Sequence, residues 1–432
     1  MSMLLVYLLN LLVLGTLVWR MWRQPWAQEL RPYFVPALGL KLLLVVALTY
    51  LYYAGILRGD RHTYHLAGIK LWEYAQQEPL AYMRLLFFNS FENEALRNAL
   101  PFTQYPDYSN SFYFIKVVSV LNLLTGGSYL LNNLYLTIYG FWGSAYLVAV
   151  LARLFPKYRA AGAVAFLFFP TVLYWSVGLM KDPVMYGSMC WLTGAAVSLA
   201  HGFRFRRWQL LLLPLQLYIL LKIKMFYAAL LLPLLLVYVL VQRLQVRFTS
   251  LQTLRAQVIC YGAVVAGALV LTALVFREKL LVDYVPQFIY ESYTGILPRA
   301  QHRPHVLLEG FEPSIKSLLL HYPEAALSAV YRPFLGESWD ILFVLSSLEN
   351  LLLLGLTLLA LAAAFRKGAH LDITLLQVVL LVFVLVMAGV VGLATPNFGT
   401  LSRYRLVFLP FLVYLLLQNV YAQRLLYWLR LR

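Results

Sequence analysis

The chain has 432 residues, of which 62% are hydrophobic and 12% are charged, and its mean hydropathy is +0.73. A soluble domain carries roughly twice that share of charge, and many apolar runs here reach the ~20 residues that a helix needs to cross a bilayer. The composition therefore excludes a soluble globular protein and predicts an all-α polytopic membrane protein. The apolar runs do not alternate with polar residues as the strands of a membrane β-barrel would.

Two further features bound the class of protein. Both cysteines, Cys190 and Cys260, fall inside apolar runs, which argues against a disulfide framework and against a cysteine metal site. Residues 1–18 are apolar but have no leading basic residues and no small-residue cleavage pattern. We therefore expect a retained helix at the N-terminus, not a signal peptide.

The hydropathy pattern predicts about eleven transmembrane helices. The run at 208–221 is short, so we expect that helix to be tilted, broken or partly buried in protein. The expected spans are 3–19, 34–56, 128–153, 160–178, 183–200, 208–221, 225–241, 256–276, 340–364, 372–394 and 405–422.

The net charge of +17 collects on one side of this topology. Short connectors on that side hold 17 of the 35 Lys and Arg residues, against only Glu29 and Asp372, whereas the rest of the chain is nearly balanced. The positive-inside bias makes this side cytoplasmic, with the N-terminus outside and the C-terminus inside. The same bias accounts for the basic charge without nucleic acid as a partner. We expect a bacterial inner (plasma) membrane, with the functional site on the periplasmic or exterior face.

The opposite, outer face carries the long connectors, where chemistry usually lies. In the first outer loop, 57–127, residues 66–88 and 111–124 have apolar periodicity but are poor spans, so we expect helices lying in the membrane interface. The predicted organisation has four parts: an extra N-terminal span and connector at 1–33, a transmembrane core at 34–276 that includes this loop, a large outer loop at 277–339, and C-terminal helices at 340–432.

This layout resembles the GT-C superfamily of integral-membrane glycosyltransferases, especially the protein O-mannosyltransferase and aminoarabinose transferase branch. The resemblance covers about 55–240. It rests on an acidic residue beyond an early span, the interfacial segment "FYFIKVVSVLNLLTGGS", and the segment "LARLFPKYRAAGAVAFLFFPTVLYWSVGLMKDPVMYG", with a weaker echo in "GTLSRYRLVFLPFL". The chain departs from the family in three ways. Two spans precede the acidic loop, Asp60 is followed by Arg61 in place of a second acid, and no separate soluble domain is present.

The resemblance implies transfer of a sugar from a polyprenyl-phosphate donor to a protein, lipid or glycan acceptor on the outer face. A carboxylate must then deprotonate or orient the acceptor hydroxyl, and cations or a metal ion must stabilise the leaving phosphate. Asp60 matches the base, next to Gly59, which allows a sharp turn. The same residue also suits a cap of a helix beginning at Arg61 or His62.

Asp182, in the outer turn "MKDPV", is the second catalytic candidate by family position. Pro183 can occupy the first position of the following helix, so Asp182 also suits a plain N-cap. Arg403 is the foremost phosphate ligand because Arg binds phosphate in a bidentate way, and Arg405 is the second. The remaining candidates for substrate or phosphate binding are Lys181, Lys222, Lys224, Arg58, Arg61, Tyr64 and Glu349.

Several of these candidates also have a purely structural interpretation. Lys181, Lys222 and Lys224 suit anchoring at lipid headgroups. Glu349 lies inside a predicted span, where an acid marks either a pathway or a buried pair, and it equally suits helix packing beside Asn350. The sequence identifies no cofactor with certainty, but His62 and His65 share a helical face and with Asp60 and Asp182 would suit a divalent metal ion. The alternative is that both are polar loop histidines.

Two other functions remain open at the level of sequence. A polysaccharide polymerase or ligase that uses a lipid-linked oligosaccharide would rely on Arg and His in a late outer loop, as found within 299–305. Aromatic residues of this loop suit sugar stacking or anchoring at the interface. A transporter of lipid-linked glycan would need no covalent chemistry, but we find no internal repeat of the transporter kind.

Overall fold

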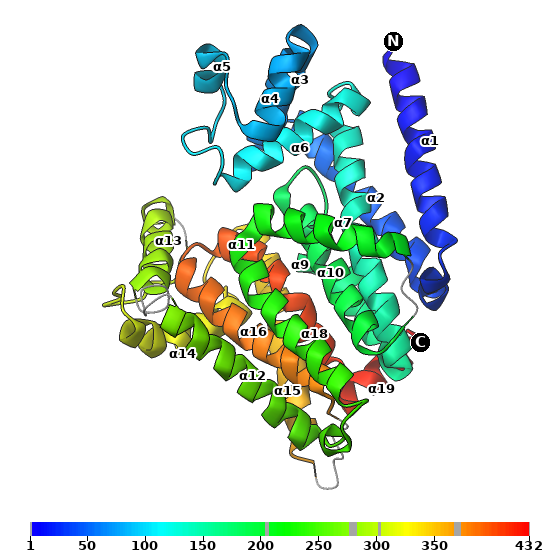
Figure 1. Ribbon diagram of the computed structural model, residues 1–432, viewed down its shortest axis with the longest axis vertical. Coiled ribbons are helices and arrows are strands. Elements are labelled where there is room, and N and C mark those ends of the chain that lie inside the picture. Colours follow the sequence, from blue (N-terminus) through cyan, green and yellow to red (C-terminus); the bar gives the residue numbers. More distant parts are fainter. Residues whose placement is uncertain (1, 204–206, 276–282, 301–303, 367–372, 432) are drawn as a thin grey trace. The chain divides into compact units, whose positions relative to one another are not determined.

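The structure is a computed structural model that describes the chain except for residues 1, 204–206, 276–282, 301–303, 367–372 and 432 (Figure 1). Its described elements are helices and turns, apart from one bridge between His305 and Asn397. Seven described helices are long and apolar enough to cross a membrane, or eight if the bent pair Phe398–Val407 and Leu409–Leu416 counts as one span. The all-helical membrane architecture predicted from the sequence is therefore confirmed, whereas the count of eleven is not.

Six of the expected spans coincide with single helices that are long and apolar enough to cross a membrane. A seventh, 183–200, also forms a single helix, α10 (Lys181–Ala200), but this helix is not one of the seven candidate spans. Residues 208–221 and 225–241 instead form one helix, α11 (Arg207–Leu244), which kinks at Lys224. The expected span at 160–178 is divided into α8 (Arg159–Ala163), a π-helical turn (Val164–Phe168) and α9 (Pro170–Trp175). The six helices that match are α1 (Met3–Trp22), α2 (Arg31–Tyr53), α7 (Tyr129–Leu154), α12 (Leu254–Val275), α15 (Ile341–Ala364) and α16 (Leu375–Ala394).

The described chain divides into two compact units. The first contains 1–153, 173–194 and 206–228, and the second contains 154–172, 195–205 and 229–432. The helices α10 (Lys181–Ala200) and α11 contribute to both. Each unit is described by itself below.

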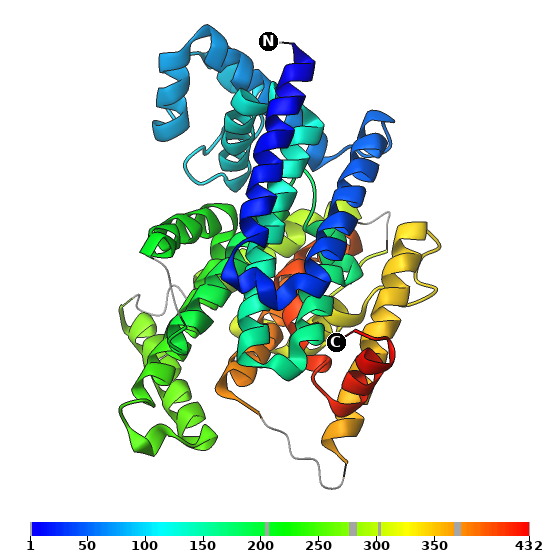
Figure 2. The ribbon, with the colours of Figure 1, turned by 90° about the vertical axis from the view of Figure 1, so that its right-hand side faces the viewer.

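In the first unit, the first outer loop folds into a helical layer beside α1 (Figures 1 and 2). The helix α3 packs along α6, where Gly68 faces Val118 so closely that a side chain at position 68 would collide with it. The expected helices at 66–88 and 111–124 are confirmed as helices, although α3 begins earlier and the first one breaks before Pro79. The layer consists of α3 (Asp60–Gln77), α4 (Pro79–Phe88), α5 (Glu94–Ala99) and α6 (Asn110–Thr125).

In the second unit, α16 packs against several other helices (Figure 1). The described parts of the large outer loop form two further helices, α13 (Val285–Ala300) and α14 (Ile315–Tyr331), and both pack against α16. Gly392 of α16 meets the backbone of Ala325 in α14, so α14 can approach only because position 392 has no side chain. Near the end of the chain lie α17 (Phe398–Tyr404), α18 (Leu409–Leu416) and α19 (Val420–Trp428).

Candidate functional site

The first unit places most of the predicted outer-face residues around the start of α3. Gly59 precedes this helix with φ +76°, a conformation that glycine adopts without strain. Asp60 is therefore the first residue of α3 and is exposed, with its carboxylate in the turn where the helix dipole favours negative charge. The expected helix start at Arg61 or His62 is thus one or two residues late, and the N-cap is Gly59.

Arg61 is the next residue and behaves differently, because only 4% of its surface is exposed. Its guanidinium carbon lies 5.6 Å from the centroid of the Tyr174 ring. Neither terminal nitrogen, Nη1 or Nη2, has a hydrogen-bond partner among the residues that the structure describes. A buried charge normally needs hydrogen-bonding partners, so this guanidinium is suited to receive an acceptor such as a phosphate oxygen.

An aromatic cluster lies on the next part of α3. The rings of Tyr52 and Tyr129 stack with their centroids 3.8 Å apart, and His65 meets the Tyr129 ring edge-on. The Tyr52 hydroxyl is 3.1 Å from Nδ1 of His62. Burial, and then the neighbouring His62, lowers the pKa of His65 to about 4, so this imidazole is neutral at pH 7.

The surroundings of the two histidines do not fit a metal site. Both rings lie beside Tyr52, each with its centroid 5.8 Å from that of the tyrosine ring. Within the described part of the chain, no group of three or more His, Cys, Asp or Glu residues is arranged to hold an ion. A divalent ion needs several such ligands, and we therefore derive no chemistry through a metal.

The turn between α9 and α10 brings a second cation to this unit. Lys181 is buried, and its Nζ donates to Oδ1 of Asn110 at 2.8 Å and to Oγ of Ser111 at 2.9 Å. The same Nζ lies 5.6 Å from the ring centroid of Tyr64, whose hydroxyl contacts Ser111. The predicted residues Lys181 and Tyr64 thus come together with the start of α6.

Asp182 follows Lys181 and is almost completely buried, at 1% exposed. It lies in the first turn of α10, which begins at Lys181, so the expected N-cap position is displaced by one residue into the helix. A buried carboxylate in the first turn is stabilised by the helix dipole. Unlike Asp60, Asp182 is not open to a bulk acceptor.

The kink of α11 carries the other two predicted lysines of the first unit. Lys222 is exposed and its Nζ lies 3.5 Å from the carbonyl oxygen of Asp107, while Lys224 lies over the Tyr227 ring at 5.3 Å. Burial, and then the charge of Lys222, lowers the pKa of Lys116 to about 8, although Asp107 acts in the opposite direction. Lys222 therefore lies near another cation, in a region suited to anions.

The second unit contains the remaining predicted residues. Arg405 is 1% exposed; its Nη1 donates to Oδ1 of Asn350 at 2.7 Å, and its Nη2 donates to the carbonyl of Arg332. Both terminal nitrogens are thus engaged by protein acceptors. Glu349 accepts a hydrogen bond of 2.7 Å from the backbone N–H of Thr171. This contact agrees with the interpretation that Glu349 has a role in helix packing. Arg403 is half-buried in α17.

Comparisons with protein-family models, curated proteins and solved structures found no match to this chain. The assignment of a function therefore rests on the residues and their geometry.

Sequence reasoning missed one cation of the first unit, Lys41. It lies in the middle of α2, is completely buried, and donates a hydrogen bond to Oγ of Ser176 in the turn before α10. The signal was present in the sequence, because Lys41 interrupts the apolar run "LGLKLLLV". An ionisable residue inside a span is a candidate functional residue.

Proposed function

We propose that this chain is a glycosyltransferase of the GT-C type, which moves a sugar from a polyprenyl-phosphate carrier to an acceptor on the outer side of a membrane. The observation that carries the proposal is the buried guanidinium of Arg61, whose two terminal nitrogens have no hydrogen-bond partner in the described structure. A planar guanidinium with free donors matches the oxygens of a phosphate.

The arrangement supports a division of labour along the start of α3. In the transfer step, a bond forms between the acceptor oxygen and the anomeric carbon of the sugar, and the bond from that carbon to the phosphate oxygen breaks. Arg61 would stabilise the negative charge that builds on the departing phosphate. Asp60, exposed at the start of the same helix, would take the proton of the acceptor hydroxyl.

Lys181 and Asp182 would support the same step from the neighbouring turn. The ammonium group of Lys181 is held in place by hydrogen bonds to Asn110 and Ser111. Both of these acceptors are neutral, so they do not cancel its positive charge. Asp182 is buried and suits a positioning role better than contact with a variable acceptor. Within the second unit, Arg403 is the foremost candidate for a phosphate ligand, because Arg405 already donates to Asn350 and to the carbonyl of Arg332.

We place the protein in a bacterial inner membrane with the N-terminus outside, following the distribution of basic connectors. In this proposal, the divided segment at 159–175, the helix α10, the two halves of α11 and the bent pair near the end complete the eleven spans.

A polymerase or ligase is the second candidate, favoured by one contact in the second unit. His305 of the late outer loop pairs with Asn397, which caps the start of α17, the helix that carries Arg403. This pairing brings a histidine of the late loop to the segment that carries Arg403. A polymerase or ligase of this kind would rely on such histidine and arginine side chains. Of the other Arg and His residues expected to act within 299–305, His302 and Arg303 lie outside the described residues.

A transfer assay tests the proposal and separates the two candidates. The full chain in lipid nanodiscs would receive a radiolabelled polyprenyl-phosphate sugar with a cell-envelope extract as acceptor, and transferred label would be counted. We expect Asp60→Asn and Arg61→Gln to lose at least a hundredfold of the rate. Arg84→Gln is the matched control, because Arg84 is an exposed outer-loop cation paired only with Glu92 among the described acids.

The opposite pattern would reject the transferase. If Asp60→Asn is tolerated while His305→Ala abolishes transfer from a lipid-linked oligosaccharide, the polymerase or ligase is correct. If the purified protein moves a lipid-linked glycan across liposomes with no transfer of sugar, both enzyme proposals fail and the chain is a transporter.

A further inference from the structure

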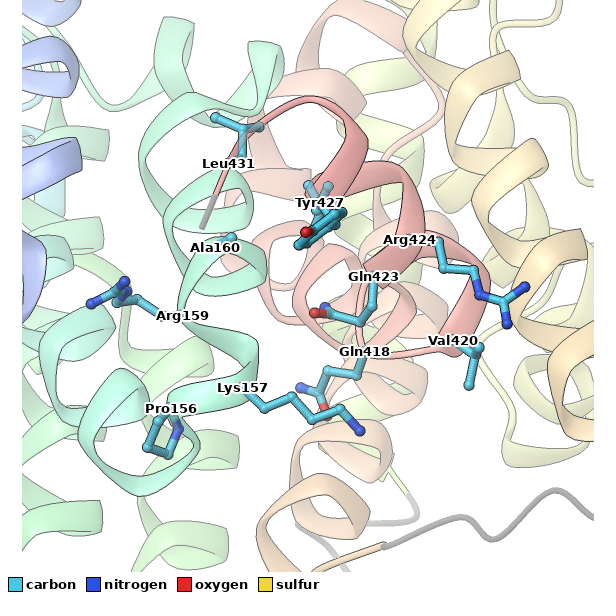
Figure 3. Close-up of a pocket in the computed structure, with 11 residues that line it drawn as sticks. Pro156, Lys157, Arg159, Ala160, Gln418, Val420, Gln423, Arg424, Tyr427 and Leu431 are labelled. Atoms are coloured by element: carbon cyan, nitrogen blue, oxygen red, sulfur yellow. The ribbon is translucent and has the colours of Figure 1, made fainter.

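A cavity of about 620 Å³ lies in the second unit, and none of the candidate residues considered above lines it. It is bordered by the turn Pro156–Tyr158 with the start of α8, and by the segment from the end of α18 through α19 (Figure 3). The sequence places both segments on the basic, cytoplasmic side. The proposed glycosyl transfer makes no use of this cavity.

The charged side chains that line the cavity are all cations: Lys157, Arg159 and Arg424. Lys157 reaches toward Gln418, and Arg424 comes from α19, whereas the guanidinium of Arg159 is directed away from these helices (Figure 3). The eleven lining residues include no Asp or Glu, and neither Lys157 nor Arg424 forms an ion pair with a described acid. Two unpaired cations that flank one cavity favour an anionic ligand.

Gln418 adds a third donor to this cavity. Its Oε1 accepts a hydrogen bond from Nε2 of Gln377, which fixes the orientation of the amide. Its own Nε2 is buried and has no hydrogen-bond partner in the described part of the chain. A buried N–H without an acceptor is costly, so a ligand oxygen at this position would satisfy it together with Lys157.

The surface of α19 indicates where the ligand comes from. Trp428 and Tyr427 are 77% and 64% exposed, and Leu425 of this short helix and Leu429 directly after it are also exposed. Exposed Trp and Tyr with Leu are typical of a helix that lies in the interface of a bilayer. The cavity beside α19 would then open at the depth of lipid headgroups.

We propose that this cavity binds a phosphate-bearing anion, and that an anionic phospholipid of the cytoplasmic leaflet supplies it. Lys157 and Arg424 contact the phosphate from two sides, and Gln418 donates its free N–H to a phosphate oxygen. The acyl chains lie along the exposed apolar residues of α19. A zwitterionic lipid binds less well because its choline or amine group meets the two cations.

Binding of soluble short-chain lipids to the full chain tests this proposal. The protein in a neutral detergent would be titrated with dihexanoyl phosphatidylglycerol, dihexanoyl phosphatidylcholine and inorganic phosphate, and a dissociation constant would be measured for each. We expect the phosphatidylglycerol to bind most tightly. Replacing Lys157→Gln and Arg424→Gln together should weaken it about 30-fold, since each cation near a membrane surface contributes roughly a fivefold factor.

Arg255→Gln is the matched control, because it removes one exposed charge from the basic side of the same unit, and Arg255 does not line the cavity. We expect it to bind phosphatidylglycerol within about twofold of the wild type. Gln418→Leu keeps all charges and should weaken binding several-fold. Thermal unfolding without lipid identifies any variant that has lost its fold, and such a variant is replaced by Lys157→Met or Arg424→Met alone.

Three results would overturn the proposal. The cavity is not an anion site if the double variant binds phosphatidylglycerol as tightly as the wild type. The effect is one of general charge if Arg255→Gln weakens binding as much as a change at Lys157. If inorganic phosphate binds as tightly as phosphatidylglycerol, with the same dependence on Lys157 and Arg424, the lipid is the wrong source and the ligand is a soluble phosphate.

Discussion

The guanidinium of Arg61 lies over the ring of Tyr174, with 5.6 Å between its central carbon and the ring centroid. A cation on an aromatic face is stabilised without using its N–H groups. The contact therefore holds Arg61 in a buried place and leaves its terminal nitrogens available to an acceptor. A carboxylate at the same position would have neutralised the charge and removed those donors.

The shape of the Arg61 side chain is expected to matter as well as its charge. Arg61→Lys keeps the positive charge but cannot donate two parallel hydrogen bonds, so we expect about tenfold weaker binding of a polyprenyl phosphate. Arg61→Gln should weaken it about a hundredfold, and Arg84→Gln should leave it unchanged. The measurement is equilibrium binding of a fluorescent polyprenyl phosphate to the full chain in nanodiscs. Equal affinity for the Arg61→Lys and wild-type proteins would exclude bidentate recognition.

The buried His65 predicts a loss of stability in acid. Its folded pKa of about 4 lies below the 6.5 of an unfolded chain, so the unfolded state binds more protons between these values. The free energy of unfolding is therefore not reduced by His65 above pH 6.5, and it declines as the pH falls toward 4. With about 1.4 kcal/mol for each unit of pKa, the loss is on the order of 3 kcal/mol at most.

Thermal unfolding of the wild type and of His65→Gln between pH 4.5 and 7.5 measures this contribution. The wild type should lose more of its melting temperature across that range than the variant does, whatever the difference between them at pH 7.5. Parallel curves for the two proteins would show that burial of His65 does not carry the acid sensitivity.

The sequence predicted the long spans well because a bilayer sets their length. The run 128–153 became Tyr129–Leu154 and the run 372–394 became Leu375–Ala394. The break at Lys224 was also visible, since two cations interrupt the apolar pattern there. Helices of the outer loop such as α14 were harder to detect, because their apolar residues are stabilised by a partner helix and not by lipid.

The site was predictable only as a set of residue types. The charged cluster around Asp60 was evident, but the sequence could not show that Asp60 is exposed while the adjacent Arg61 is buried. That difference depends on which helix covers each side of α3. The bonds of Arg405 to Asn350 and Arg332 join residues 55 and 73 positions apart, and no local pattern encodes such a contact. Arg61 and Arg405 therefore differ in whether their N–H groups are available to a phosphate, and only tertiary packing determines that difference.

The close approach of α14 to α16 should depend on Gly392. A methyl group at this position would meet the carbonyl and backbone of Ala325, so α14 must shift. We expect Gly392→Ala to lower the free energy of unfolding by about 1–3 kcal/mol, measured by denaturant or thermal unfolding in detergent.

Gly355→Ala is the matched control for this prediction. Gly355 lies in α15 of the same unit, and nothing occupies the space that its side chain would fill. Ala is the better helix former, so this change should be neutral or stabilise by up to about 1 kcal/mol. Similar effects of the two changes would mean that α14 does not pack on Gly392.

The buried Arg405 should depend on Asn350 for stability. Asn350→Leu removes the acceptor of Nη1 and leaves a charged donor buried without a partner, which costs about 2–3 kcal/mol. Asn350→Asp retains an oxygen for the guanidinium and adds an opposite charge, so its unfolding should stay close to that of the wild type. The comparison also separates support of the fold from contact with substrate. If Asn350→Leu unfolds like the wild type but binds polyprenyl phosphate less tightly, then Arg405 acts on the ligand and not on the fold.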